Sequence, residues 1–153
     1  MTTSCSKNTT TTPTPTPITP TPSYTFSAMG ITAAGVQYTI SNQTAGPLKI
    51  TGTTGNGTGG NDQSVVITIN SVVNSVGTYT LSSSTNNTGV YTSGTNSIRY
   101  STNTSPNVGT LTISKYDAAN RVMSVSFSFN AQQYYPTVGS SANVYGSFTN
   151  VGF

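Results

Sequence analysis

Alternation of apolar and polar residues with a period of two is the feature that most limits what this chain can fold into. Residues 123–129 read M-S-V-S-F-S-F, which puts four apolar side chains on one face of an extended strand and three serines on the other. Residues 110–114 read T-L-T-I-S in the same pattern. Because a helix needs a repeat of about 3.6 residues, this pattern predicts β-strands that bury one face.

The segment between these two runs is polar and contains Asp117 and Asn120, both of which favour turns. We therefore expect residues 110–114 and 123–129 to form an antiparallel hairpin. Further strands are predicted wherever apolar or β-branched runs lie between stretches rich in Gly, Asn and Ser. They are residues 24–29, 36–41, 47–53, 63–70, 77–82, 97–100 and 144–151. About nine short strands without a helical stripe predict an antiparallel β-sandwich or a flattened barrel.

The N-terminal 23 residues differ from the rest of the chain. Residues 9–22 read T-T-T-T-P-T-P-T-P-I-T-P-T-P. Proline fixes φ, lacks a backbone donor and pushes the preceding residue towards extended geometry, so repeated Thr-Pro favours polyproline II. We expect residues 1–23 to be a disordered or extended Thr/Pro-rich stalk, followed by a single β domain at 24–153.

Charged residues are scarce in this sequence. The 153 residues include 5 Lys and Arg and 2 Asp and Glu, which gives a net charge of +3 and a charged fraction of 5%, against about 25% in ordinary soluble domains. The five cations are scattered, whereas nucleic-acid binding needs them clustered, so no nucleic-acid partner is expected. A surface of Thr, Ser, Asn and Gln is typical of extracellular and cell-surface β-proteins.

Groups that could carry out catalysis are nearly absent. The chain has no His, and its only carboxylates, Asp62 and Asp117, fall in predicted turns. Serine triads and cysteine–histidine pairs are thereby excluded, and a carboxylate pair is not expected. One carboxylate beside Asn61 in the Gly-rich loop 54–62 is a poor ligand set for Ca²⁺. We expect no enzyme activity, no cofactor and no metal site.

Cys5 is the only cysteine, so an internal disulfide cannot form. Residues 4–7 read S-C-S-K, with a small residue before the cysteine and the polar stalk after it, as at the lipidated junction of a bacterial lipoprotein. No apolar segment precedes Cys5 in this sequence, and the competing interpretation is an incidental exposed thiol. No apolar run of about 20 residues occurs, so no membrane-spanning helix is predicted.

The S-C-S-K segment with its low-complexity linker resembles the N-termini of lipoproteins from Bacteroidota. The domain resembles a family of small outer-membrane lipoproteins of unknown function in those bacteria. The matching segments are Y-T-F-S-A-M-G at 24–30, V-V-I-T-I-N at 65–70, G-T-Y-T-L at 77–81, G-T-L-T-I-S at 109–114, V-S-F-S-F-N-A at 125–131 and V-Y-G-S-F-T-N-V-G-F at 144–153. The resemblance implies an outer-membrane, surface-exposed lipoprotein and supplies no catalytic residue.

The function that fits these features is a lipid-anchored, non-catalytic accessory or interaction module of an outer-membrane complex or surface polymer. Its candidate contact surfaces are the loops 54–62, 83–89 and 101–109 and the aromatic pair before Pro136, which could instead cover a sheet edge. The individual contact candidates are Asn56, Asn61, Asp62, Tyr134 and Tyr135. Two alternatives stay open: a carbohydrate-binding module that uses tyrosine platforms, and a self-assembling filament or coat subunit.

Overall fold

The computed structural model describes residues 21–29, 31–32, 36–42, 46–54, 62–94, 97–104 and 106–153. Cys5 and nearly all of the predicted stalk lie outside these residues. The described chain is all-β, with eleven strands in one sheet. The strands are β1 (Ser23–Ala28), β2 (Ile31–Thr32), β3 (Val36–Asn42), β4 (Leu48–Thr54), β5 (Ser64–Ile69), β6 (Gly77–Leu81), β7 (Thr88–Thr92), β8 (Arg99–Ser101), β9 (Gly109–Asp117), β10 (Val122–Tyr135) and β11 (Ser141–Gly152).

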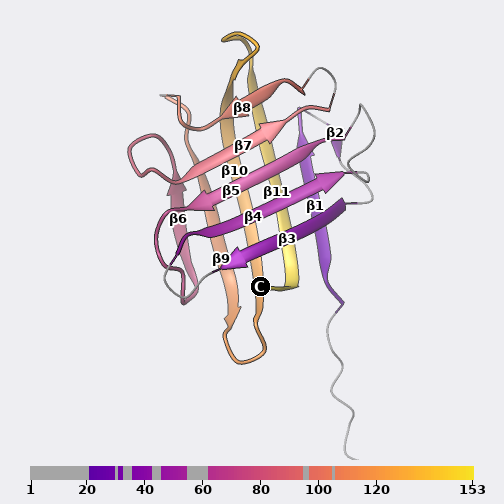
Figure 1. Cartoon of the computed structure of the whole chain (residues 1–153), viewed down its shortest axis with the longest axis vertical. Helices are drawn as coiled ribbons and strands as arrows, with labels where there is room; N and C mark the ends of the chain where they lie inside the picture. The colour runs from indigo at the N-terminus through magenta and orange to yellow at the C-terminus, as the bar shows by residue number, and fades with distance from the viewer. Residues whose placement is uncertain are drawn as a thin grey trace, which may run out of the picture.

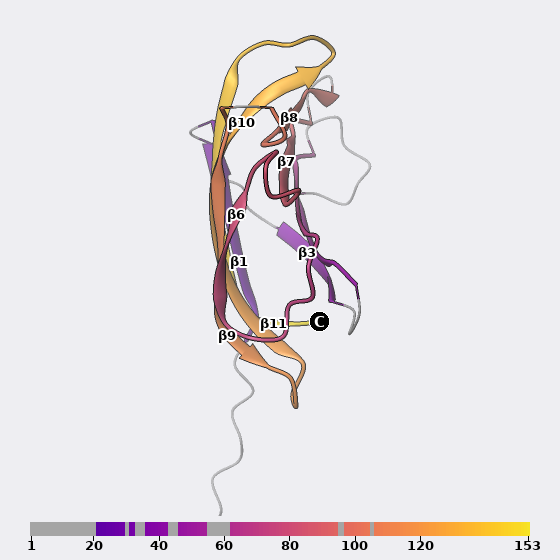
Figure 2. The same cartoon turned by 90° about the vertical axis from the view of Figure 1, so that its left-hand side faces the viewer.

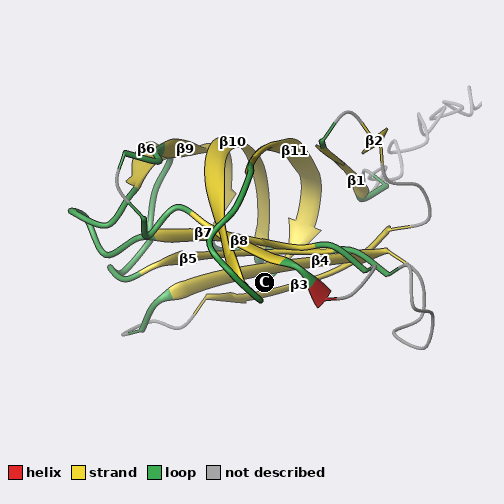
Figure 3. Ribbon diagram, turned by 90° about the horizontal axis from the view of Figure 1, so that it is seen from above, coloured by secondary structure: helices red, strands yellow, loops and turns green. Residues whose placement is uncertain are grey.

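Strand β10 joins the two layers of the fold. On one side it pairs with β11. On the other it pairs first with β9, over Val122 to Phe129, and then with β8, over Gln132 to Tyr135. The first layer therefore runs β2-β1-β11-β10-β9-β6 and the second runs β8-β7-β5-β4-β3. Figure 3 shows the two layers from above, and Figure 2 shows the β10–β11 hairpin bending over towards β8.

The core lies between the two layers. Burial alternates along β5 and β10 in the way that their sequences predict, with Ile67 and Phe127 inside and Thr68 and Ser128 outside. The largest fully buried side chains are Phe26, Phe148, Leu48, Ile50, Ile67, Ile69, Leu81, Leu111, Ile113, Met123, Val65 and Val73. The strands form because their alternating faces supply this core. The all-β, sandwich or flattened-barrel prediction is confirmed.

The start of β1 and the end of β10 lie at opposite ends of the domain. Ser23, where β1 begins, pairs with Thr149 of β11, close to the hairpin that joins β9 to β10. The C-terminal end of β10, with Tyr134 and Tyr135, lies at the other end of that 14-residue strand. In Figure 1 the start of β1 is at the bottom and the end of β10 at the top.

The predicted hairpin of 110–114 with 123–129 is confirmed, and Ile113 faces Val125 across it. Two strands were not predicted. Strand β2 has only two residues, too few for a sequence pattern. Strand β7 begins inside the segment 83–89, which was interpreted as a loop because of its Asn and Gly residues. In the structure Gly89 is buried, and its missing side chain leaves room for the ring of Phe129.

Candidate functional site

The predicted contact residues lie in different places. Asn56 and Asn61 are outside the described residues. Asp62 lies two residues before the start of β5 and takes part in an interaction within the structure. Tyr134 and Tyr135 end β10 and are 43% and 50% exposed. On one side Tyr135 pairs with Arg99 of β8, whereas on the other side the pairing of β10 with β11 ends at Gln132.

Strand register shows which predicted positions share one end of the second layer. Tyr135 pairs with Arg99 of β8, Arg99 with Thr92 of β7, and Thr92 with Ser64 of β5. Three strand spacings of about 4.8 Å therefore separate Ser64 from Tyr135, or roughly 14 Å. The segment that contains Asp62 and the tyrosine pair thus belong to the same end of the layer, but they do not form one cluster.

The aromatic pair is held in place by β8. The register between β8 and β10 shifts between Gln133 and Tyr135, so Tyr134 occupies an irregular position in the strand. The guanidinium carbon of Arg99 lies 5.4 Å from the centre of the Tyr135 ring, a cation–π distance. The following peptide bond, to Pro136, is cis. Tyr135 is thus engaged by Arg99, while Tyr134 faces a hollow on the outer side of the layer.

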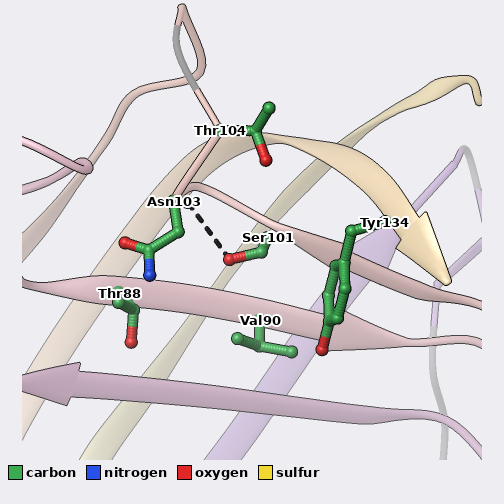
Figure 4. Close-up of a pocket in the computed structure, with 6 residues that line it drawn as sticks. All are labelled: Thr88, Val90, Ser101, Asn103, Thr104 and Tyr134. Atoms are coloured by element: carbon green, nitrogen blue, oxygen red, sulfur yellow. Dashed lines mark hydrogen bonds between the residues drawn. The ribbon is translucent and has the colours of Figure 1, made fainter. Parts of the chain in front are cut away.

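This hollow has a volume of about 390 Å³, and the described residues that line it are six, from three neighbouring strands and the loop after β8. Thr88 and Val90 come from β7, Ser101 ends β8, and Tyr134 comes from β10. Asn103 and Thr104 follow β8 in the chain. Figure 4 shows the Tyr134 ring on one side and Asn103 on the other, with Val90 between them and Thr104 above.

The wall formed by residues 101–104 is fixed to the strands beneath it. The backbone amide of Asn103 donates to the Ser101 hydroxyl at 3.1 Å. Thr102 is fully buried; its amide donates to the Gly89 carbonyl and its hydroxyl accepts from the Gly89 amide, both at 3.0 Å. The carbonyl of Thr104 accepts from the side-chain amide of Asn107 at 2.8 Å. The backbone of this wall is therefore fixed before a ligand binds.

The two carboxylates lie apart. Asp117 ends β9 and accepts two hydrogen bonds from Asn120, one from its backbone at 3.0 Å and one from its side chain at 2.7 Å. These bonds lower the pKa of Asp117 below its ordinary value. Asp117 pairs with Val122 at the start of β10, whereas Asp62 belongs to the end where β10 finishes. Asp117 is therefore a turn former, as the sequence predicts.

The described part of the chain lacks two features. Among those residues there is no group of three or more His, Cys, Asp or Glu side chains that could hold a metal ion. The described residues also contain no helix long and apolar enough to cross a membrane.

The sequence predicted only some of the residues that line the hollow. The loops 83–89 and 101–109 and Tyr134 were candidates, and the structure places Thr88, Asn103, Thr104 and Tyr134 around one space. The strand that carries Thr88 and Val90 was missed, because residues 83–89 were interpreted as a loop and no strand was predicted directly after them. The signal that could have found them is the alternation in T-G-V-Y-T at 88–92, whose inward residue Tyr91 is buried while Val90 faces outward.

Comparison with curated proteins finds no match. Comparison with solved structures finds none either. A family model matches residues 30–152, which is most of the chain and nearly all of the β domain. The expectation of a family of unknown function is thus confirmed, and the lipoprotein and Bacteroidota parts of the resemblance stay predictions. The chain belongs to the family described as Domain of unknown function (DUF6252).

Proposed function

We propose that this protein is a lipid-anchored, non-catalytic interaction module of the outer-membrane surface, and that it contacts its partner with the end of β10. The partner is a membrane complex or a surface polymer of the same cell. The observation that carries the proposal is the opposite placement of two features of the domain. The β domain begins at Ser23 at one end, and the exposed pair Tyr134 and Tyr135 stands at the other.

This placement suits a tethered module. Strand β10 has 14 residues, and at about 3.3 Å per residue its contour is roughly 45 Å. Ser23 lies beside Thr149, which is near Ser124 of β10, so a domain attached through its N-terminal segment would hold the tyrosine pair at most about that far from its point of attachment. Exposed tyrosines are favoured in protein contacts because they bury a large ring and keep a polar tip. The pair therefore has the position and the chemistry of a contact surface.

Cys5 supplies the attachment in this proposal. It is the only thiol of the chain, with Ser4 before it and the Thr/Pro-rich segment after it. Two acyl chains on one residue give stable membrane binding, which a single chain does not. The Thr-Pro repeat would then act as a semi-rigid spacer between membrane and domain.

Fatty-acid labelling tests the anchor. The protein, expressed from its native gene in a Gram-negative host, is expected to incorporate labelled palmitate and to fractionate with the outer membrane. The Cys5→Ser variant is expected to lose both properties, whereas the Thr9→Ala control keeps them. An unlabelled wild-type protein that remains in the aqueous fraction would refute the anchor.

Cross-linking on intact source cells tests the contact surface. Wild type is expected to give one dominant cross-linked partner, identified by mass spectrometry. The double variant Tyr134→Ala, Tyr135→Ala is expected to reduce that yield about tenfold or more, since buried aromatic anchors carry most of the energy of an interface. Tyr145→Ala is the matched control, because Tyr145 is 54% exposed on the outer face of the other layer. Equal yields from all three proteins would contradict the proposal.

A further inference from the structure

The hollow beside Tyr134 has the size of a small-molecule site. Its volume of about 390 Å³ lies within the range of roughly 300–1,000 Å³ that ligand pockets occupy. It opens on the outer face of the second layer, and residues from β7, β8, β10 and the loop after β8 line it. Elements separated by more than forty positions in the chain thus converge on one space.

The lining is polar and uncharged. Among the described residues of the lining, five of six side chains end in a hydroxyl or an amide, namely Thr88, Ser101, Asn103, Thr104 and Tyr134, and none of the six is Lys, Arg, Asp or Glu. An apolar ligand would cover these groups without replacing their bonds to water, at a cost of about 1–3 kcal/mol for each one left unpaired. A phosphate or carboxylate would find no cation in the lining. A neutral molecule that carries several hydroxyls would hydrogen-bond to these polar groups and needs no cation.

Tyr134 adds a flat surface to this set of polar groups. Its ring is 43% exposed and forms one side of the hollow, opposite Asn103, with the apolar Val90 between them. A tyrosine ring offers a large amphipathic contact area at a small cost in conformational entropy. The carbon-bound hydrogens of a sugar ring form an apolar face that fits such a surface, while the hydroxyls at its edge reach the surrounding amide and hydroxyl groups.

The backbone of the polar wall needs little ordering when a ligand binds. The backbone of Thr102 is bonded to Gly89, and the carbonyl of Thr104 is bonded to Asn107. Groups that are fixed before binding lose less entropy, so more of the contact energy appears as affinity. The guanidinium of Arg99, also on β8, lies over the Tyr135 ring next to this wall, which makes acidic sugars the main competing ligands.

We infer that this hollow binds a neutral saccharide unit, with Tyr134 as the stacking surface and Asn103 as a hydrogen-bonding partner. The inference rests on the proposed function and names the ligand of the same surface: the partner is recognised through uncharged sugar residues.

The test uses the full chain against an array of neutral and acidic glycans, followed by calorimetry with the best neutral oligosaccharide on the array. Tyr134→Ala and Asn103→Ala are each expected to weaken its binding by about tenfold or more, which corresponds to about 1.4 kcal/mol. The matched control Tyr145→Ala is expected to change binding less than about twofold. Thermal unfolding of each variant verifies that the fold is retained.

Three outcomes overturn the inference. They are the absence of any neutral hit on the array, binding of acidic glycans alone, and neutral binding that Tyr134→Ala leaves unchanged. The proposed function fails separately, because its cross-linking test detects any partner of the β10 end. A cross-linked partner that depends on Tyr134 and Tyr135, together with an empty glycan array, would keep the interaction module and reject the saccharide.

Discussion

Gly146 of β11 occupies a position that only a glycine fits. A Cβ added there would overlap the backbone oxygen of Thr25, and it would lie 2.7 Å from Cζ of Phe127 and 2.9 Å from Cα of Phe26. Two of these three neighbours are backbone atoms, which cannot move aside as the end of a flexible side chain can. Strand β1 therefore approaches β11 closely at this residue, and the packing of both strands depends on it.

We expect Gly146→Ala to lower the free energy of unfolding by about 1–3 kcal/mol or more, the usual cost of forcing extra volume into a packed site. Urea denaturation followed by circular dichroism measures the change. Gly152→Ala on the same strand is the control: its Cβ would meet only the Arg121 carbonyl, at 3.8 Å, and its effect should stay within about 0.5 kcal/mol. Similar values for the two variants would show that the close approach is wrong.

Tyr24 of β1 stacks on Phe148, with ring centres 4.4 Å apart. Its hydroxyl is buried and has no hydrogen-bond partner within the described residues. Burial raises the pKa of Tyr24 above its ordinary value of 10.0, because the charged form would have to leave water. The ring thus contributes to packing, whereas the hydroxyl contributes a desolvation cost.

Tyr24→Phe should keep the packing and remove that cost, so at pH 7 its stability should equal wild type or exceed it by about 1 kcal/mol. Above pH 10 the unfolded state ionises Tyr24 while the folded state keeps it neutral. Wild type should therefore lose up to about 1.4 kcal/mol per pH unit from this residue as the pH rises, and the variant should not. Urea unfolding at pH 8 and pH 11 measures the difference, with Tyr145→Phe as control. A variant less stable than wild type at both pH values would contradict this interpretation.

The alternation of apolar and polar residues predicted the strands that have one face in the core and the other face towards solvent. Strands β9 and β10 were predicted because Leu111, Ile113, Val125 and Phe127 all point into the core. The large apolar residues of this pattern end at Phe129, where the predicted strand ended, although the buried Ala131 continues the alternation by one step. The observed β10 continues to Tyr135 because the chain leaves β9 and pairs with β8. Local alternation carries no information about this change of partner.

The hollow could not be predicted for the same reason. Its lining joins Thr88 to Tyr134 through the register of β7 with β8 and of β8 with β10. These pairings connect residues that are remote in sequence, and no local pattern specifies them. Tyr134 was identified because an aromatic pair before Pro136 is conspicuous. The polar residues opposite it were seen only as parts of a loop.

Strand β11 is the element whose loss should cost the most, since it pairs with β10 on one side and β1 on the other. Its Phe148 is fully buried and contacts the rings of Tyr24 and Phe127. We expect Phe148→Ala to lower the free energy of unfolding by about 3–5 kcal/mol, as truncation of a buried aromatic usually does. Tyr145→Ala, an exposed change on the same strand, should cost much less. Equal costs, measured by urea unfolding, would place Phe148 outside the core.

The outer faces of the two layers carry different side chains. Across the first layer, register aligns Thr25, Ser147, Ser126, Thr112 and Thr78 in one row of hydroxyls. Tyr145 is an exposed aromatic one step further along β11. The second layer carries the Tyr134 hollow at the end remote from Ser23. The proposed partner contact lies at that end and not at the row of hydroxyls, and the exposed residues Tyr134 and Tyr145 distinguish the two surfaces.

Hydroxyl-radical footprinting of the protein on its native membranes shows which end of the domain meets the partner, because tyrosines oxidise readily when exposed and mass spectrometry locates the product. The reactivity of Tyr134, Tyr135 and Tyr145 is compared between the free protein and the membrane-associated protein. We expect Tyr134 and Tyr135 to be protected from oxidation in the membrane-associated protein, while the reactivity of Tyr145 stays unchanged. Protection of Tyr145 with Tyr134 and Tyr135 left fully reactive would contradict it.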